Sequence, residues 1–265
     1  MKQLIKLFTP PIILLVYKKI FKSRYGWQGD YSTWRKAQKA SMGYDSDKIL
    51  QTVKHSLLKV KNGEAVYERD SVLFDEVQYN WPLLSGLMYA AAKSNGRLYV
   101  MDFGGSLGST YFQNKKFLDN LHDVKWTIVE QAHFVETGKQ SFETDVLKFY
   151  ADIDSCVEEV KPNVLLLSSV LQYIEKPYEL LEKLLNYKFD LIIVDRTPFV
   201  HQGGDTIKLQ YVDPSIYDAS YPCWFFDVQG FIKYFNKKSW LIKEEYHDPY
   251  GELTFLKSYI LEKAR

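Results

Sequence analysis

Beyond residue 95, apolar residues come in short runs, separated by stretches in which apolar positions recur every three or four residues. Five runs have the length of strands, and they cover residues 98–101, 126–129, 147–152, 163–168 and 189–195. The fourth run is continuously apolar, as expected of a strand buried on both faces. Strands that alternate with helices run parallel to one another. The pattern therefore predicts an α/β fold with a doubly wound, mostly parallel sheet.

The last part of the chain adds two predicted strands, at 240–246 and 253–262, with only a loop between them. A short connection makes such strands antiparallel. With the five parallel strands they give a seven-stranded, Rossmann-like sheet. Before them, Gly203-Gly204 and Pro214 indicate a long loop over 201–224, which leads to a predicted helix at 227–235.

Residues 25–95 have a mainly helical pattern, with helices predicted over 31–40, 46–60 and 81–93. They would form an N-terminal helical cap on a domain that comprises 96–265. Residues 1–24 differ, because their short apolar patches are followed by lysines and an arginine. No patch approaches the ~20 residues of a membrane-spanning helix. Two roles remain for this segment: a terminal helix packed on the domain, which we favour, and peripheral contact of residues 1–22 with the inner membrane.

Composition narrows the class of protein. The chain has 265 residues, 46% of them apolar, which suffices for one large domain or a domain with a smaller cap. A net charge of +1 gives no basic footprint for nucleic acid. Cys156 and Cys223 lie far apart and have no His or Cys neighbour, so we expect reduced thiols in a cytoplasmic protein and no metal site.

The first predicted strand ends in Asp102 and runs into a glycine-rich turn. Gly104, Gly105 and Gly108 allow positive φ and let a ligand approach the backbone closely. A helix is predicted from about Ser109, and the free N–H groups at its start favour a negative ligand group. Ligands of open α/β sheets bind at the carboxyl ends of the strands. We therefore expect a binding site at this turn.

The second predicted strand ends in Glu130. A strand, a glycine-rich turn, a helix and a strand ending in an acid form the layout of a nucleoside-binding βαβ unit, in which the second acid binds the ribose hydroxyls. The alternative is a tight turn without a ligand, followed by an ordinary exposed glutamate. At the end of the third strand, Asp152 is a candidate for contact with the exocyclic amine of adenine.

The spacing of the turn indicates which nucleotide it binds. Asp102-x-Gly104-x-Ser106-x-Gly108 resembles the Asp/Glu-x-Gly-x-Gly-x-Gly loop of class I S-adenosylmethionine (SAM) methyltransferases, with Ser106 in place of the middle glycine. The dinucleotide fingerprint does not fit, because the third glycine falls one position early, and no P-loop lysine follows. SAM carries an ammonium and a sulfonium, which an acid such as Asp102 would favour.

Longer strings of residues resemble one family more closely. They lie at 26–32, 68–71, 102–109, 112–114, 129–131, 168–173, 195–199 and 219–224. Together they are similar to a family of SAM-dependent methyltransferases encoded in bacterial surface-polysaccharide gene clusters. The resemblance implies a class I fold, SAM as cofactor and a saccharide or related small-molecule acceptor. It also implies that Gln131, Ser168 and Ser169 belong to the cofactor site.

Catalytic residues are expected near the ends of the fourth and fifth strands. Related small-molecule methyltransferases often have Leu-x-His after the fourth strand, where this chain has Tyr173 in place of the histidine. Asp195 is our first choice for a general base, and an ion pair with Arg196 or a turn cap is the alternative. His201 is our second choice, and Tyr173 could orient the acceptor.

The predicted loop over 201–224 would cover the acceptor, and its rings could stack on a sugar. These rings are Tyr211, Tyr217, Tyr221 and Trp224, and their packing against the core is the alternative. Glu68, Arg69 and Asp70 could line the mouth of the pocket, or form a solvated turn.

The sequence thus predicts a bacterial SAM-dependent methyltransferase that acts on a saccharide in surface-glycan synthesis. Two rivals share its sheet. One is an NAD-dependent oxidoreductase, against which the misplaced glycine counts. The other is a non-catalytic, methyltransferase-like module that binds partners in a glycan-assembly complex.

Overall fold

The computed structural model describes residues 25–43, 46–69, 71–201, 203–214, 216–247 and 255–264. Residues 1–24, to which we assigned a terminal helix or a membrane contact, lie outside the described residues, as does Asp70. Within the described ranges, no helix has both the length and the apolar character that crossing a membrane requires.

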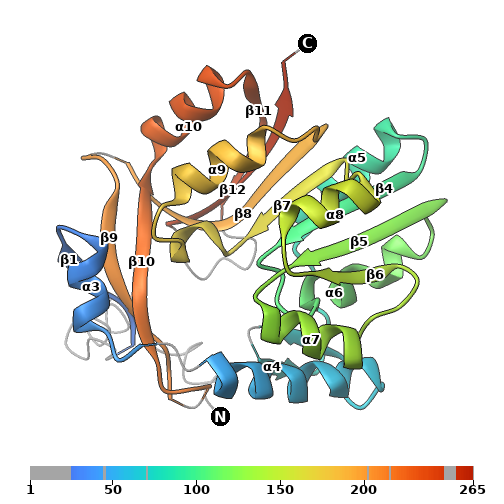
Figure 1. Ribbon diagram of the computed structural model, residues 1–265, viewed down its shortest axis with the longest axis horizontal. Coiled ribbons are helices and arrows are strands. Elements are labelled where there is room, and N and C mark those ends of the chain that lie inside the picture. Colours follow the sequence, from blue (N-terminus) through green and yellow to red (C-terminus); the bar gives the residue numbers. More distant parts are fainter. Residues whose placement is uncertain are drawn as a thin grey trace, which may run out of the picture.

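Seven strands form the centre of the molecule in the order β6–β5–β4–β7–β8–β12–β11 (Figure 1). Their bounds are β4 Arg97–Phe103, β5 Asp123–Val129, β6 Leu147–Tyr150, β7 Val164–Ser168, β8 Leu191–Val200, β11 Trp240–His247 and β12 Leu256–Lys263. The first five run parallel, and β12 lies antiparallel between β8 and β11. This arrangement confirms the predicted Rossmann-like fold with a reversed last strand.

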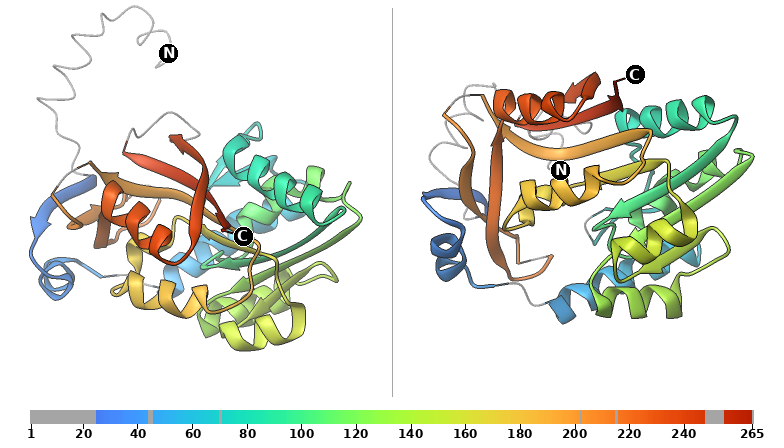
Figure 2. Two further views of the ribbon diagram at one scale, coloured as in Figure 1. Left: turned by 90° about the horizontal axis from the view of Figure 1, so that it is seen from above. Right: turned by 45° about the horizontal axis from the view of Figure 1, so that its top comes forward.

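Alternate residues of the central strands serve two cores, one on each face of the sheet. Val100 and Leu166 join one core, and Met101 and Leu167 join the other. The first core is covered by α4 Ser46–Lys61, α5 Trp81–Lys93, α6 Ser109–Leu118 and α7 Ala132–Ser141. The second is covered by α8 Ile153–Val160, α9 Pro177–Leu185 and α10 Val228–Lys237. Helices on both faces explain why the central strands are apolar on both sides. Figure 2 shows α10 beside β11, at the edge of the sheet.

The prediction of a long loop over 201–224 is wrong in two places, because this range contains one strand and the start of another. β9 Thr206–Tyr211 and β10 Ser220–Asp227 pair antiparallel, and β1 Gly26–Tyr31 pairs with β9. At its far end, β10 runs parallel to the end of β8, so the three strands extend the sheet to ten. We call β1, β9 and β10 the side sheet. Its signal was the alternation of buried Ile207 and Leu209 with polar neighbours, a period-two pattern typical of a half-buried strand.

The region predicted as a helical cap contains the expected helices together with short strands. α3 Trp34–Ala40, α4 and α5 are helices, whereas β2 Tyr67–Arg69 and β3 Val72–Phe74 form a hairpin. Asn80 caps α5, since its side chain accepts a hydrogen bond from the N–H of Leu83, and Pro82 occupies the first turn. Figure 1 shows α4 and the side sheet on different sides of the carboxyl ends of the central strands, and β2 contacts α4.

Candidate active site

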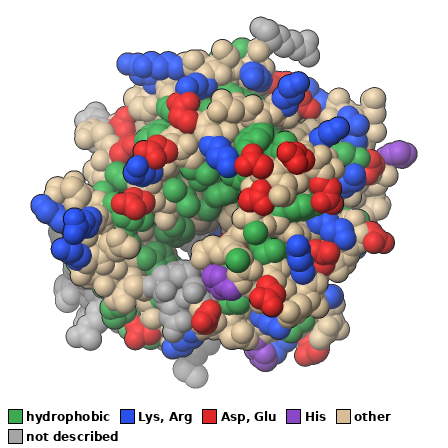
Figure 3. Space-filling view, in the orientation of Figure 1, with side chains coloured by type: hydrophobic (Ala, Val, Ile, Leu, Met, Phe, Trp, Pro, Cys, Tyr) green, Lys and Arg blue, Asp and Glu red, His purple; other side chains and the backbone are tan. Residues whose placement is uncertain are grey.

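A cavity of about 850 Å³ lies at the carboxyl ends of β4, β5, β7 and β8. The hairpin and α4 close one side of it, and the side sheet closes another; its opening is the hollow in Figure 3. The volume is within the range of small-molecule sites. Most of the predicted site residues line this cavity, namely Asp102, Gly104, Gly105, Ser106, Glu130, Gln131, Ser168, Ser169, Tyr173 and Asp195.

The glycine-rich loop is built around two positions that leave no room for a side chain. A Cβ at Gly104 would lie 2.4 Å from Cγ2 of Val170, and φ is +71° there. A Cβ at Gly105 would lie 2.5 Å from the carboxylate of Asp102. The N–H of Gly104 donates to the carbonyl of Val129 at 2.9 Å, which ties the loop to β5. The glycines therefore fix the path of the backbone along the cavity wall.

Ser106 has the backbone conformation that a glycine would adopt at this place. Its φ is +55°, in the left-handed region that a glycine adopts without strain and a residue with a side chain rarely adopts. Gly108, with φ +102°, then begins α6 and lies behind the loop, outside the residues that line the cavity.

Asp102 is buried beneath the loop. Its side chain is 1% exposed, and its carboxylate accepts a hydrogen bond from Nε1 of Trp126 at 3.1 Å. Burial raises the pKa of Asp102 to about 7; the charges of Glu130 and Asp195 act in the same direction, and the Trp126 bond opposes them. A cation placed beside this carboxyl would stabilise its ionised form.

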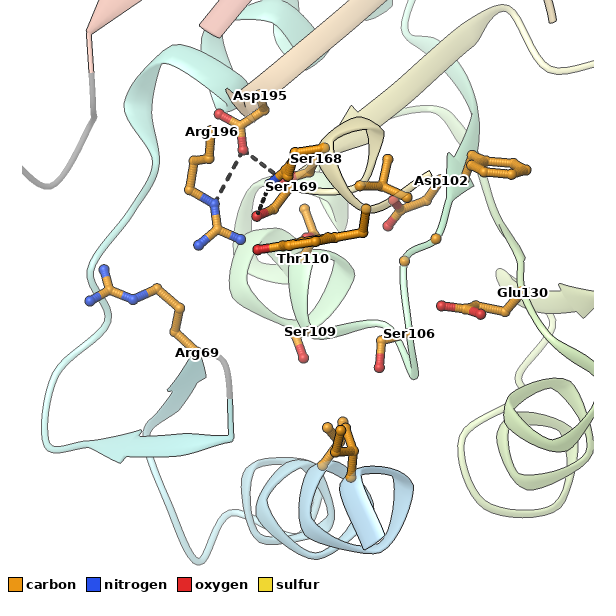
Figure 4. A pocket seen from close by; sticks show the side chains of 18 of the residues that line it. Arg69, Asp102, Ser106, Ser109, Thr110, Glu130, Ser168, Ser169, Asp195 and Arg196 are labelled. Carbon is orange, nitrogen blue, oxygen red and sulfur yellow. Dashed lines mark hydrogen bonds and ion pairs between the residues drawn. The ribbon is translucent and has the colours of Figure 1, made fainter. Parts of the chain in front are cut away.

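Glu130 stands at the end of β5, across the loop from Asp102 (Figure 4). Its carboxylate accepts a hydrogen bond from the N–H of Gln131 at 2.7 Å, and the backbone of Ser106 donates to it as well. Burial raises its pKa, and these two bonds oppose that shift. A carboxylate has about four acceptor positions, so capacity remains for ligand hydroxyls.

Asp152 does not reach the cavity, which corrects its predicted contact with adenine. Its two carboxylate oxygens accept from the N–H and the hydroxyl of Ser155, each at 2.8 Å, so it is the N-cap of α8. These bonds lower its pKa. Ala151 lines the cavity instead.

The sequence left two placements open for Glu68, the mouth of the pocket and a solvated turn. Its side chain is 3% exposed and lines the cavity. It accepts from the hydroxyl of Ser109 at 2.6 Å and from the N–H of Ser71 at 2.6 Å. Glu68 therefore joins the β2–β3 hairpin to the first turn of α6, where a carboxylate is favoured by the helix dipole.

Asp195 is a buried hub, and this corrects its assignment as a general base. Its side chain is 0% exposed. Oδ1 accepts from Asn80 at 2.9 Å and from Ser258 at 2.7 Å, while Oδ2 accepts from Ser168 at 2.6 Å. Nε of Arg196 lies 3.6 Å from Oδ2. A carboxylate so fully bonded has little capacity left to accept a proton from a substrate. The alternative that we gave for it, an ion pair with Arg196, fits this geometry.

His201 also fails as a base, because it is exposed at the end of β8 and is not among the residues that line the cavity. Tyr173 does line it, and its hydroxyl donates to Oε1 of Gln210 at 2.7 Å. Its ring meets Tyr221 edge to face at 5.2 Å. Tyr173 thus links the central sheet to the side sheet.

The four predicted stacking rings divide between two roles. Tyr217 and Tyr221 line the cavity. Tyr211 and Trp224 pack between the side sheet and α3 instead, where Trp224 stacks on Trp34 at 5.9 Å. Nε1 of Trp224 also donates to the carbonyl of Ile174. Trp27 and Trp34 also line the cavity, and nothing in the sequence placed them there.

Within the described ranges, no group of three or more His, Cys, Asp or Glu side chains could hold a metal ion. Both cysteines are free and buried. Burial raises the pKa of Cys156 to about 11 and that of Cys223 to about 12, so neither is a nucleophile at neutral pH.

Comparison with known proteins gives relatives by fold only. No protein-family profile matches this sequence, and no curated protein matches it. Three solved structures illustrate the likeness. One is the 1,6-didemethyltoxoflavin-N1-methyltransferase of Burkholderia thailandensis, at 13% identity over 84% of this chain and 92% of that one, with a TM-score of 0.42. CalS10, an amino pentose methyltransferase from Micromonospora echinaspora, is 8% identical over 70% and 91%, with a TM-score of 0.46. The magnesium protoporphyrin IX methyltransferase of Synechocystis PCC 6803 is 13% identical over 70% and 83%, with a TM-score of 0.46.

Proposed function

We propose that this protein is a SAM-dependent methyltransferase that transfers a methyl group to a saccharide or related small-molecule acceptor in surface-glycan biosynthesis. One observation carries the proposal: the glycine-rich loop after β4 and the acid after β5 border the same cavity. The backbone of this loop has positive φ at Gly104, Ser106 and Gly108. The saccharide and the glycan setting rest on the resemblance of the sequence strings.

The residues present fit the parts of SAM. Gly104 and Gly105 let the loop backbone pack directly against Val170 and Asp102, and both glycines line the cavity, where the methionine part would lie against this backbone. Asp102 would face the ammonium, and Glu130 would accept hydrogen bonds from the ribose hydroxyls. Phe134 and Ala151, which line the same end, offer an apolar surface for the adenine. When bound, SAM supplies an electrophilic methyl group.

Positioning of the acceptor is the main task left to the protein. Holding an acceptor oxygen or nitrogen against the methyl group can account for roughly 7–11 kcal/mol of barrier reduction in good cases. Tyr173, Tyr217 and Tyr221 border the space where the acceptor would lie. The carboxylate of Asp195 keeps Ser168 and Arg196 in place and does not take up the proton.

Transfer of a labelled methyl group tests the proposal. The purified protein is incubated with methyl-labelled SAM and with nucleotide sugars or lipid-linked oligosaccharides from polysaccharide-producing bacteria. We expect label in a saccharide with the parent protein, and none with a Gly104→Val variant, whose side chain would clash with Val170 and displace the loop. Binding of S-adenosylhomocysteine (SAH) without any transfer would instead support the non-catalytic module. Binding of NAD without SAH would support the oxidoreductase.

A further inference from the structure

The side sheet has two faces, and one of them borders the cavity. Leu209 and Tyr211 of β9 pack on the other face, in a small apolar core with Ala37 of α3. Successive side chains of a strand point to opposite faces, so Gln210, which lies between these two residues, points away from α3. Gln210 is partly exposed and lines the cavity. The side sheet therefore brings a polar side chain to the cavity wall.

Strand pairing places Gln210 in the middle of a row of three residues. Gln210 is paired with Trp27 of β1 on one side and with Tyr221 of β10 on the other. Residues that are directly opposite on neighbouring strands project to the same face of a sheet. All three line the cavity. This wall thus has an amide between two aromatic side chains, and we call Trp27, Gln210 and Tyr221 the Gln210 row.

Tyr173 sets the orientation of the Gln210 amide. Its hydroxyl donates to Oε1 of Gln210 at 2.7 Å, which leaves the two N–H groups of Nε2 to other partners. Within the described ranges no protein group bonds to Nε2, and Nε2 is not among the buried side-chain atoms that lack a partner. Nε2 is therefore accessible, and it can donate a hydrogen bond to a ligand in the cavity.

Two separate parts of the fold hold Gln210 in place. Its backbone belongs to β9, and its side chain is bonded to Tyr173, the last residue of the short 3₁₀ helix η1 Leu171–Tyr173. This helix follows β7, whose carboxyl end brings Ser168 and Ser169 to the same cavity. A donor that is already fixed loses little freedom when a ligand binds. Gln210 is thus pre-organised for recognition.

Trp27 places an apolar surface beside this donor. The centre of its ring lies 5.0 Å from that of Phe255 and 6.4 Å from that of Phe225, edge to face in both cases. These contacts fix the indole, which stays partly exposed at the cavity. Small-molecule sites commonly combine aromatic surface with a few polar groups that set the orientation of the ligand. A saccharide ring matches this wall, because it has an apolar C–H face and oxygens at its edge.

We propose that Gln210 is a specificity-determining residue for the methyl acceptor. Its Nε2 donates to an oxygen of a saccharide, and Trp27 contacts the apolar face of the same sugar ring. Tyr173 acts through Gln210, as a positioning residue. The inference rests on the proposed function and adds the residues that recognise its acceptor.

Calorimetric titration with three neutral sugars tests this inference. The protein is first titrated with SAH and is then held saturated with it, while D-glucose, D-galactose and N-acetyl-D-glucosamine are titrated in turn. We expect at least one of them to bind at millimolar concentration. N-Acetyl-D-glucosamine differs from glucose by an acetamido group, so a preference for it indicates that the oxygen bound by Gln210 is a carbonyl.

Two substitutions of Gln210 assign the effect. Gln210→Leu removes the amide and should weaken binding of the preferred sugar about tenfold or more, because an oxygen of the sugar is left without its partner. Gln210→Glu keeps an acceptor for Tyr173 and has no N–H group. A loss in both variants indicates a sugar oxygen that only accepts, whereas a loss in Gln210→Leu alone indicates a hydroxyl, which can donate to the carboxylate.

Further variants separate recognition from folding. Trp27→Leu should weaken the same sugar about threefold or more, because it reduces the apolar contact area. SAH affinity should stay unchanged in each of these variants, which shows that they are folded. Gln229→Leu is the matched control, since Gln229 is exposed on α10 and is not among the residues that line the cavity; it should change neither affinity.

Three outcomes overturn the inference. Binding of none of the three sugars would show that the Gln210 row does not recognise a saccharide. Equal sugar affinities of the parent and Gln210→Leu would show that the amide does not contact the sugar. Loss of SAH affinity in the folded Gln210→Glu variant, with an unchanged melting temperature, would assign Gln210 to the cofactor. Failure of the parent to bind SAH is read separately in the first titration, and it would reject the proposed function itself.

Discussion

The two ends of the cavity are assembled in different ways. The proposed cofactor end comes from one continuous stretch, residues 97–151, in which strands β4, β5 and β6 alternate with helices α6 and α7. The opposite end, where we propose that the acceptor binds, comes from distant segments, with Arg69 on β2, Arg196 on β8, Tyr221 on β10 and Leu256 on β12. We call it the acceptor end. A site built from consecutive elements leaves a readable pattern of residues. A site built from distant segments depends on strand pairing that no local pattern records.

Asp195 tests the acceptor end most severely, because it joins the distant segments. Asp195→Ala removes the acceptor for Asn80, Ser168 and Ser258 and leaves Arg196 without its carboxylate. We expect a loss of about 3–5 kcal/mol in the free energy of unfolding, measured by urea denaturation. His201→Ala is the control and should change stability by less than about 0.5 kcal/mol. A loss below about 1 kcal/mol in Asp195→Ala would show that the hub does not hold the acceptor end together.

Gly104 tests the cofactor end. Gly104→Ala would place a methyl group 2.4 Å from Val170 in a backbone with φ +71°. We expect an unfolding free energy lower by about 2–4 kcal/mol, from overpacking and strain together, and no measurable SAH binding. Gly63→Ala separates the two causes, because φ is +75° there and nothing lies within 4 Å of the added Cβ. Equal losses of unfolding free energy in the two variants would mean that backbone strain alone acts, and that the loop is not tightly packed against Val170.

The ionisation of Asp102 should be visible in the pH dependence of stability. Burial raises its pKa to about 7, so between its unfolded pKa of about 4 and about 7 the folded protein holds a proton that the unfolded chain has released. The free energy of unfolding should therefore fall as pH rises through this window. From about pH 5 to about pH 8, the parent should lose about 2 kcal/mol more than Asp102→Asn, measured by urea denaturation. Identical pH profiles of the parent and Asp102→Asn would show that Asp102 is ionised throughout this range. Burial would then not raise its pKa.

Tyr173 tests the join between the central sheet and the side sheet, with the smallest effect. Tyr173→Phe removes the hydrogen bond to Gln210 and keeps the ring against Tyr221. We expect a loss of about 0.5–1.5 kcal/mol in stability, a lower kcat/KM for the acceptor and an unchanged SAH affinity. Tyr89→Phe serves as the control, because it removes only a long, exposed hydrogen bond of 3.4 Å from the Tyr89 hydroxyl on α5 to Glu262. A weakened SAH affinity would place Tyr173 in the cofactor end.

The sequence predicted the central sheet because each of its elements carries a local signal. The apolar runs marked the parallel strands, and Asp102, Gly104 and Glu130 marked the turn and the second strand end. Even Ser106, which departs from the pattern, has a left-handed conformation of the kind that glycine favours. Residues whose roles are set within one βαβ unit could therefore be placed without a structure.

The acceptor end escaped prediction for physical reasons. β1 and β9 are brought together by pairing between residues more than 150 positions apart, and Gly203-Gly204 made that region resemble a loop. Asp195 and Arg196, which both line the cavity, lie at a bulge where they together oppose Ser258. This bulge arises from the register of β8 against β12, and no residue type in the sequence predicts it. Asp195 was predicted to end the fifth strand, but β8 continues to Val200. The hydrogen bonds of Asp195 with Asn80, Ser168 and Ser258 could not be foreseen, so it was taken for a base.

Calorimetric titration with SAH, beside a Glu130→Ala variant, tests the central claim most directly. Each lost charge-assisted hydrogen bond to a ribose hydroxyl should cost about 1.5–3 kcal/mol, so we predict binding by the parent and affinity weaker by about tenfold or more in the variant. Because Glu130 also accepts from the backbone of Gln131, the melting temperature of the variant is measured alongside, and Glu130→Gln, which keeps an acceptor oxygen, should fall between the two. No binding by the parent at millimolar SAH would contradict the claim that this cavity is a SAM site.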